Sequence, residues 1–164
     1  MNYVILHVGE TKESYYKEAF GEFQKRMNAY GSLKNIVIKP AKTPGRELSE
    51  DEIHLALEKE AEAIENALSD PKLSKSCKIA LCIEGKMLSS EALAALFEKE
   101  AISGKNTVLF LIGSSWGLHE RIKKMCDLRL SFSPMTFAHS LFRVMLAEQI
   151  YRAAGILQGS KYHK

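Results

Sequence analysis

The chain has 164 residues, of which 46% are hydrophobic and 26% charged, a balance typical of one folded domain and unlike a disordered chain. No apolar stretch approaches the roughly 20 residues that a membrane-spanning helix needs. The net charge is only +3, but residues 120–164 carry eight Lys or Arg against three Asp or Glu, a balance of +5 that leaves −2 for the remainder. Such a basic segment favours an anionic partner such as nucleic acid, although a solvated basic surface gives the same count.

The cysteine and histidine patterns favour a reduced, metal-free protein. Cys77, Cys82 and Cys126 are an odd number without a Cys-x-x-Cys pair, so we expect thiols rather than a disulfide framework. The histidines show no ligand spacing, so we expect no metal centre. The opening segment Met1–Leu6 lacks a basic region and a cleavage site, so we interpret it as a strand and expect a cytoplasmic location.

The hydrophobic pattern predicts strands and helices that alternate along the chain. In the first half we expect a strand over Tyr3–Val8, a helix over Lys12–Tyr30, a strand over Asn35–Lys39 and a helix from an N-cap at Ser49 to about Ser69. In the second half we expect a strand over Lys78–Ile83, a helix from Ser89 or Ser90 to Ile102, a strand over Thr107–Ile112, a short helix over Leu118–Cys126, a strand over Leu128–Phe132 and a final helix from about Thr136 to Gly155.

This alternation predicts a single α/β domain over residues 1–164, with a mostly parallel sheet between two helical layers. Ligands of such sheets bind beyond the carboxyl ends of the strands, where Gly9, Gly85 and Gly113 are expected. The common nucleotide-binding glycine motifs and the Gly-x-Ser-x-Gly elbow of hydrolases are absent. The residues alone therefore predict a ligand cleft with a basic flank, and leave the chemistry open.

Four motifs in the last third resemble a known family. They are Leu111–Leu118 (LIGSSWGL), Leu130–His139 (LSFSPMTFAH), Arg143–Ala153 and the closing Tyr162-His163-Lys164. Together with the opening strand through Val8-Gly9 and the segment Ile83–Lys86, these motifs resemble the ribosomal RNA large subunit methyltransferase H family, of the SPOUT class of S-adenosylmethionine-dependent methyltransferases.

The resemblance implies a SPOUT-type fold with a trefoil knot in the C-terminal part, which general topology rules would argue against. It also implies a homodimer in which each active site is completed by the partner subunit. The implied reaction is methylation of N3 of pseudouridine 1915, in helix 69 of 23S ribosomal RNA, on the assembled 70S ribosome. The implied cofactor is S-adenosylmethionine.

The cofactor residues implied by the resemblance lie in three loops that follow strands. They are Leu81, Gly113, Phe132, Ser133, Pro134, Met135, Thr136 and Phe137. Free backbone groups of such loops can read an adenine edge, although Phe132 and Phe137 are nearly as well explained by core packing. Three positions depart from the family pattern: Ser114 replaces a common second glycine, Pro134 a frequent lysine and Ala138 a frequent proline.

Methyl transfer to N3 requires loss of the N3 proton, and five residues are candidates for the catalytic roles. His163, Tyr162, Glu148 and His139 could take the proton, and Arg143 could hold a phosphate or a developing anion. The alternatives are structural. Glu148 is spaced to pair with Arg152 one helical turn later, and His139 could be an ordinary hydrogen-bonding residue near a helix start.

The basic segment supplies candidates for contact with RNA: Arg121, Lys123, Lys124, Arg129, Arg152, Lys161 and Lys164. Trp116 and Tyr162 could stack on splayed bases, although Trp116 could instead pack across a dimer interface. Two other functions remain open. One is a non-catalytic ribosome-binding or assembly factor that retains the fold, and the other is a small-molecule α/β enzyme with a solvated basic face.

Overall fold

The computed structural model describes residues 1–163 and contains eleven helices and strands. In chain order they are β1 (Asn2–Val8), α1 (Ser14–Met27), β2 (Ser32–Ile38), α2 (Glu50–Leu68), α3 (Pro71–Ser74), β3 (Cys77–Met87), α4 (Ser90–Ile102), β4 (Thr107–Ile112), α5 (Glu120–Lys124), β5 (Leu128–Ser131) and α6 (His139–Leu157). Within residues 1–163, no helix is both long and apolar enough to cross a membrane.

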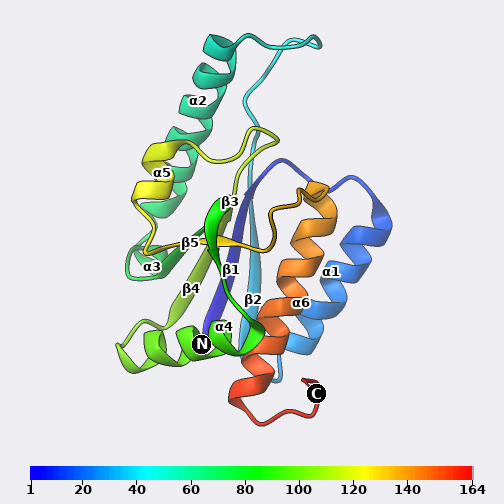
Figure 1. Cartoon of the computed structure of the whole chain (residues 1–164), viewed down its shortest axis with the longest axis vertical. Helices are drawn as coiled ribbons and strands as arrows, with labels where there is room; N and C mark the ends of the chain where they lie inside the picture. Colours follow the sequence, from blue (N-terminus) through cyan, green and yellow to red (C-terminus); the bar gives the residue numbers. More distant parts are fainter. Residues whose placement is uncertain (164) are drawn as a thin grey trace.

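The five strands form one sheet in the order β2-β1-β4-β3-β5, and every neighbouring pair is parallel. β4 therefore lies between β1 and β3, at the centre of the sheet (Figure 1). Because all strands run the same way, their carboxyl ends meet at one edge. The predicted α/β class with a mostly parallel sheet is confirmed.

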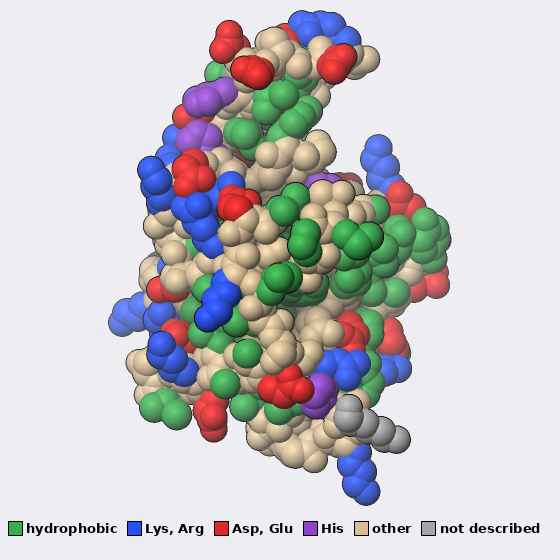
Figure 2. Space-filling model, viewed as in Figure 1, with side chains coloured by type: hydrophobic (Ala, Val, Ile, Leu, Met, Phe, Trp, Pro, Cys, Tyr) green, Lys and Arg blue, Asp and Glu red, His purple; other side chains and the backbone are tan. Residues whose placement is uncertain are grey.

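Helices cover both faces of the sheet, as successive strand residues point to opposite sides. Ile5 and Phe110 face α1, α4 and α6, whereas Leu6 and Leu111 face α2, α3 and α5. Figure 1 shows these helices on the two sides of the sheet. In the same view, Lys and Arg side chains lie among acidic ones along the α2 and α5 side (Figure 2). The sheet is therefore buried on both faces, as an all-parallel sheet requires.

Serine caps begin two of the helices as the sequence predicts. Ser49 accepts the backbone N–H of Glu52 at 3.3 Å, and the Glu52 carboxylate accepts the N–H of Ser49 at 2.9 Å, which completes a capping box. Ser89, rather than Ser90, caps α4 by accepting the N–H of Ala92 at 3.1 Å. Each cap satisfies an amide that the helix itself leaves unpaired.

Two short elements differ from the prediction. The helix expected over Leu118–Cys126 is limited to α5, because Nδ1 of His119 accepts the N–H of Arg121 at 3.1 Å and starts the helix there. The sequence pattern also missed α3, a single turn that begins with Asp70 as N-cap and a proline at its first position. Both are decided by local capping rather than by hydrophobic periodicity.

β3 is longer than the predicted strand, and its extension crosses β5. The pairing shifts register so that Leu130 is matched with both Leu81 and Lys86. A Cβ at Gly85 would lie 2.5 Å from the carbonyl carbon of Leu130, so the two backbones can approach this closely only at a glycine. The trefoil knot that the resemblance implies stays a prediction.

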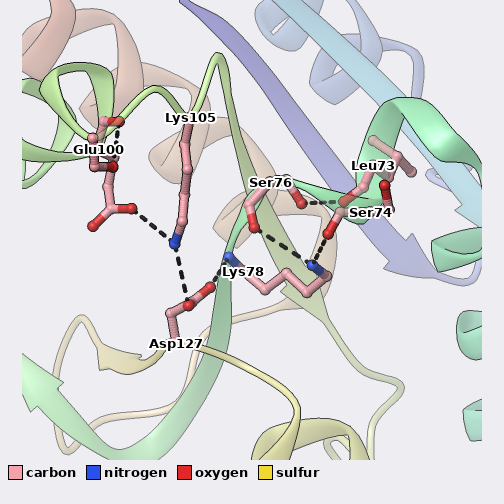
Figure 3. Close-up of polar contacts among 8 residues, drawn as sticks. Leu73, Ser74, Ser76, Lys78, Glu100, Lys105 and Asp127 are labelled. Atoms are coloured by element: carbon pink, nitrogen blue, oxygen red, sulfur yellow. Dashed lines mark hydrogen bonds and ion pairs between the residues drawn. The ribbon is translucent and has the colours of Figure 1, made fainter.

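Asp127 fixes the start of β5 against β3 (Figure 3). Its carboxylate accepts the N–H of Lys78 at 2.7 Å and bonds the ammonium of Lys105 at 3.2 Å, and its own N–H donates to the carbonyl of Lys78 at 2.8 Å. Lys105 also pairs with the buried Glu100 at 2.9 Å. Burial opposes ionisation of Asp127, but these hydrogen bonds outweigh it and lower its pKa.

Candidate active site

A cavity of about 550 Å³ lies beside the middle of β3 and at the carboxyl ends of β4 and β5, a volume within the range of small-molecule sites, roughly 300–1,000 Å³. Three segments form it: 81–84, which lies inside β3 at its shift of register, 113–118, which follows β4, and 130–137, which includes the end of β5 and the loop after it. Because each strand belongs to the rigid sheet, its end delivers the following loop to a fixed place. The cavity therefore lies where an open α/β sheet is expected to bind a ligand.

The turn after β4 depends on two glycines. A Cβ at Gly113 would lie 2.0 Å from the carbonyl oxygen of Gly117, and Gly117 has a φ of +85°. The N–H of Gly117 donates to the carbonyl of Ser114 at 2.9 Å and closes the turn. Ser114 itself has an ordinary negative φ, so the absence of a second glycine at this position introduces no backbone strain.

The loop after β5 is held by side-chain hydrogen bonds and aromatic packing. Ser133 accepts the N–H of Met135 at 3.0 Å, and the ring of Phe142 lies 4.8 Å from that of Phe132 and 6.1 Å from that of Phe137. Phe142 belongs to α6, so the aromatic cluster joins this loop to the helix that follows. Both loop phenylalanines thus pack against α6 and also line the cavity.

The structure brings together nearly all residues that the resemblance assigns to the cofactor. Those that line the cavity are Leu81, Gly113, Phe132, Ser133, Met135, Thr136 and Phe137. Pro134 is exposed and does not line the cavity. The change from lysine to proline at this position therefore removes no group from the wall of the cavity.

The charged groups of the cavity come from β3 and α5, and a histidine comes from α6. Lys123 forms an ion pair with Glu84, and this hydrogen bond lowers the pKa of the Glu84 carboxyl. His139, the first residue of α6, lines the same cavity. Burial, and then the neighbouring charge of Arg143, lower the pKa of His139 below its usual value. At neutral pH this imidazole is uncharged and able to accept a proton.

Arg143 lies in a second cavity, of about 340 Å³, between β1, β2, α1 and α6. Only 4% of Arg143 is exposed, and its guanidinium donates to Thr11 Oγ1 at 2.8 Å and to the Val8 carbonyl at 3.1 Å. His7, also buried here, donates from Nδ1 to the carbonyl of Gly9 at 2.8 Å. Among residues 1–163, Nε2 of His7 and Nε of Arg143 have no partner.

No carboxylate within residues 1–163 forms an ion pair with Arg143, since neither of its hydrogen bonds goes to an acid. Buried charges are normally paired, because an isolated ion loses its hydration without compensation. Burial therefore lowers the pKa of Arg143. A cation held in this way can stabilise negative charge that appears beside it.

The other predicted catalytic residues lie in the middle of α6 and in the tail that follows it. Glu148 accepts from Arg152 at 2.6 Å and from the Tyr162 hydroxyl at 3.2 Å, and the Arg152 guanidinium lies over the Tyr162 ring at 4.6 Å. His163 donates from Nε2 to Glu91 at 2.7 Å. The predicted pairing of Glu148 with Arg152 is thus present, and the tail after α6 folds back along the helix.

The five predicted catalytic residues therefore form two separate groups within one chain. His139 and Arg143 lie in the first turns of α6, whereas Glu148, Tyr162 and His163 belong to its second half and to the tail. Because a helix rises about 1.5 Å per residue, the groups are separated along its axis. Within residues 1–163, no hydrogen bond joins the two groups.

Most cations predicted to contact RNA have acidic partners in the folded chain. The ion pairs are Arg121 with Glu58 and Glu65, Lys123 with Glu84 and Glu120, Arg129 with Glu120, and Arg152 with Glu148. Lys124 and Lys161 are exposed, and no ion pair involves either within residues 1–163. Lys164 lies outside the described residues. Trp116 is 38% exposed at the rim of the first cavity.

Sequence reasoning missed several residues of the two cavities. Glu84 and Cys82 line the first, and His7 and Thr11 line the second. His7 carries a signal that was available, because it is a histidine in the otherwise apolar run Val4–Val8. Thr11 carries none, since its role depends on a contact with a helix that comes much later in the chain.

Comparisons with known proteins agree with this geometry. A family model described as "Predicted SPOUT methyltransferase" matches residues 1–163. The chain is 42% identical to "Ribosomal RNA large subunit methyltransferase H" of Bacillus pumilus and 44% identical to "Putative ribosomal RNA large subunit methyltransferase H" of Methanococcus maripaludis, each over 164 residues and 100% of both chains.

A solved structure supports the fold. The tRNA (m1G37) methyltransferase from Aquifex aeolicus matches with a TM-score of 0.53 at 18% identity, and the match covers 100% of this chain and 73% of that one. At this identity the likeness concerns the fold alone. The full-length matches in sequence decide the family, and they confirm the resemblance read from the motifs. The chain therefore belongs to the ribosomal RNA large subunit methyltransferase H family of SPOUT methyltransferases.

Proposed function

We propose that this chain transfers a methyl group from S-adenosylmethionine to N3 of pseudouridine 1915, in helix 69 of 23S ribosomal RNA, on the assembled 70S ribosome in the cytoplasm. The names of its full-length relatives support a ribosomal RNA methyltransferase. The single observation that carries the proposal is the cavity beside β3 and beyond β4 and β5, lined by all but one of the residues expected to bind the cofactor.

The residues of this cavity fit S-adenosylmethionine. Backbone groups near Leu81 and Gly113 would bind the polar edge of the adenine, and Phe132 and Phe137 would cover its faces. When bound, S-adenosylmethionine supplies an electrophilic methyl group on a sulfonium. The task of the protein is then to position the acceptor nitrogen in line with it.

His139 and Arg143 have the properties that the acceptor chemistry needs. Loss of the N3 proton leaves negative charge on the base, and the new N–CH₃ bond forms as the S–CH₃ bond breaks. The uncharged imidazole of His139, which lines the cofactor cavity, is able to take the proton. The buried guanidinium of Arg143 is suited to stabilise the negative charge, because no acid within residues 1–163 forms an ion pair with it.

We propose that the chain acts as a homodimer in which a second copy completes each site. This proposal explains why Tyr162 and His163 lie apart from His139 within one chain. A second copy that supplied its tail to the cavity would place these groups near the reacting atoms. Completion of each site by the partner subunit makes the dimer a requirement for activity rather than only for stability.

We expect the exposed side chains around the cavity and the exposed lysines that are unpaired in the described part of the chain to contact RNA. Trp116 and Met135 lie exposed at the cavity, and Lys124 and Lys161 are exposed cations. Among the described cations expected to contact RNA, only Lys124 and Lys161 form no ion pair within residues 1–163, so this set makes a modest phosphate contribution to affinity. Recognition of the assembled ribosome by its shape fits such a surface better than reading of a short sequence.

The test is methyl transfer from labelled S-adenosylmethionine to 70S ribosomes that lack the modification, with free 23S RNA and separated subunits in parallel. We expect label at pseudouridine 1915, mainly with 70S ribosomes. Cofactor binding, measured by calorimetry, is followed on the same preparation. If the protein binds ribosomes but neither binds the cofactor nor transfers labelled methyl groups, the proposal is wrong and a non-catalytic assembly factor takes its place. Label on free RNA alone would overturn the 70S substrate.

A further inference from the structure

A cluster of potential metal ligands lies away from both cavities, where α2 meets α5. His54 and Glu58 stand one turn apart on α2, and His119 precedes α5. One ligand atom of each lies within 4.8 Å of the other two. Nε2 of His119 is 3.1 Å from Glu58 Oε1, and the two imidazole rings meet edge to face at 5.6 Å. Histidine side chains gather over α2 and α5 in Figure 2.

We propose that His54, Glu58 and His119 bind a zinc ion. Two imidazoles and one carboxylate are ligands that zinc prefers, and three protein ligands leave a fourth position for water. Calcium and magnesium prefer oxygen ligands and are poorly suited to two nitrogens. His54 is exposed and His119 and Glu58 are half-buried, so an ion can reach the cluster from solvent without unfolding the chain.

Zinc binding would replace existing hydrogen bonds of His119 and Glu58. The N–H of Arg121 donates to Nδ1 of His119, so Nε2 carries the proton that faces Glu58. Coordination through Nε2 moves this proton to Nδ1, and the imidazole then gives up the amide of Arg121. The guanidinium of Arg121 bonds both Glu58 and Glu65, so it keeps an acidic partner when Glu58 turns to zinc.

The position of the cluster means that a bound ion would link two distant parts of the chain. His119 directly follows Leu118, the last residue of the turn that lines the first cavity. Zinc would therefore fasten this turn to α2, a helix from a distant part of the chain. The sequence pattern did not predict this metal site, because only two of its three ligands, His54 and Glu58, share a helix face. The inference does not depend on the proposed reaction, since it concerns metal binding by the resting chain.

The test uses the full-length, metal-free protein and zinc chloride in calorimetry. We expect one zinc per chain, and we expect His54→Ala and His119→Ala each to weaken binding by at least about tenfold. His163→Ala is the matched control, because it removes another histidine paired with a glutamate, Glu91, that has no second histidine beside it. It should bind zinc as the unmodified chain does.

Two measurements separate this site from other causes. Cys82 and Cys126 are free thiols that also attract zinc, so the titration is repeated with both changed to serine, where binding should persist. Cobalt should give a visible spectrum of a tetrahedral site that disappears in His54→Ala. His54 makes no hydrogen bond within residues 1–163, so this variant tests the ligand without removing the α5 cap. Undiminished zinc binding in His54→Ala, or no saturable binding at all, would overturn the proposal.

Discussion

Arg143 donates a hydrogen bond from its guanidinium to the carbonyl oxygen of Val8, at 3.1 Å. The contact joins α6 to the carboxyl end of β1, where Gly9 leaves the sheet with a φ of +83°. A Cβ at Gly9 would lie 3.9 Å from the same guanidinium. The cation is thus held by a backbone carbonyl and a hydroxyl, two neutral groups, while the nearby charge of Glu13 favours its charged form without forming an ion pair. This arrangement fixes the direction of the charge without neutralising it, as catalysis by a preorganised site requires.

Replacement of Arg143 by alanine should therefore lower turnover by at least about tenfold. S-adenosylmethionine affinity should change little, because Arg143 lines the second cavity and not the first. Single-turnover methylation and calorimetry measure the two quantities separately. Arg26→Ala is the matched control, since Arg26 is an exposed arginine that pairs with Glu22 on α1. Equal losses of turnover in the two variants would contradict a specific role for Arg143.

His7 should make the protein sensitive to mild acid. Burial, and then the charge of Arg143, lower its pKa from 6.5 to about 4. The unfolded chain therefore binds a proton between these values and the folded chain does not, so the free energy of unfolding falls as the pH is lowered from 6.5 to 4. By pH 4 the free energy of unfolding has fallen by an amount on the order of 3 kcal/mol through this group. Above pH 6.5 the group has no effect on stability.

Urea unfolding at pH 7 and pH 5 measures this effect. His7→Asn keeps a donor for the carbonyl of Gly9 but has no titrating ring, so its stability should fall less over the same interval. His54→Asn, measured with the other two proteins in metal-free buffer, is the control at an exposed histidine. An identical pH dependence in all three proteins would show that another group controls acid sensitivity.

Periodicity and caps predicted the sheet class and most elements, because each depends on neighbours within a few residues. Ser49 and Ser89 are examples, as is the strand over Thr107–Ile112, which the structure reproduces at both ends. Strand order, the extension of β3 across β5 and the pairing of Asp127 with Lys78 depend on distant contacts. No local pattern specifies such contacts.

The candidate site likewise has features that local motifs predict and features that depend on distant contacts. The cofactor loops were predicted through motifs, and the structure brings all of them except Pro134 to one cavity. The isolation of Arg143 and the pairing of most basic residues with acids were not predictable, because both depend on which side chains meet in the folded chain. Arg121, for example, meets Glu58 and Glu65 of a helix that lies far earlier in the sequence.

Asp127→Asn should destabilise the fold at the β3–β5 contact. The amide keeps one acceptor for the N–H of Lys78 but loses the ion pair with Lys105, which then faces only Glu100. We expect a loss of about 0.5–1 kcal/mol in the free energy of unfolding, because the ion pair is partly exposed. Denaturant unfolding measures it, with the exposed Glu98→Gln as control. A loss no larger than that of the control would mean that the pair contributes nothing.

Gly113→Ala should disrupt the first cavity. Its Cβ would lie 2.0 Å from the carbonyl oxygen of Gly117, a backbone atom that cannot move alone. We expect cofactor affinity to fall by about tenfold or more, because the turn that forms one wall must shift. Gly21→Ala is the control, as nothing lies within 4 Å of the added carbon and alanine favours a helix. Normal cofactor binding by Gly113→Ala would separate this turn from the cofactor site.

The separation of Arg143 from His163 leads to a test of the shared site. If Arg143 of one copy acts with His163 of the other, Arg143→Ala and His163→Ala are each inactive, but a mixed dimer contains one site with both residues intact. Random exchange of equal amounts makes half of the dimers mixed, so activity should return to about a quarter of the unmodified level. If both residues acted within one chain, the mixture would stay inactive, because neither copy carries both. Methyl transfer by the co-refolded mixture, compared with each variant alone, distinguishes the two arrangements.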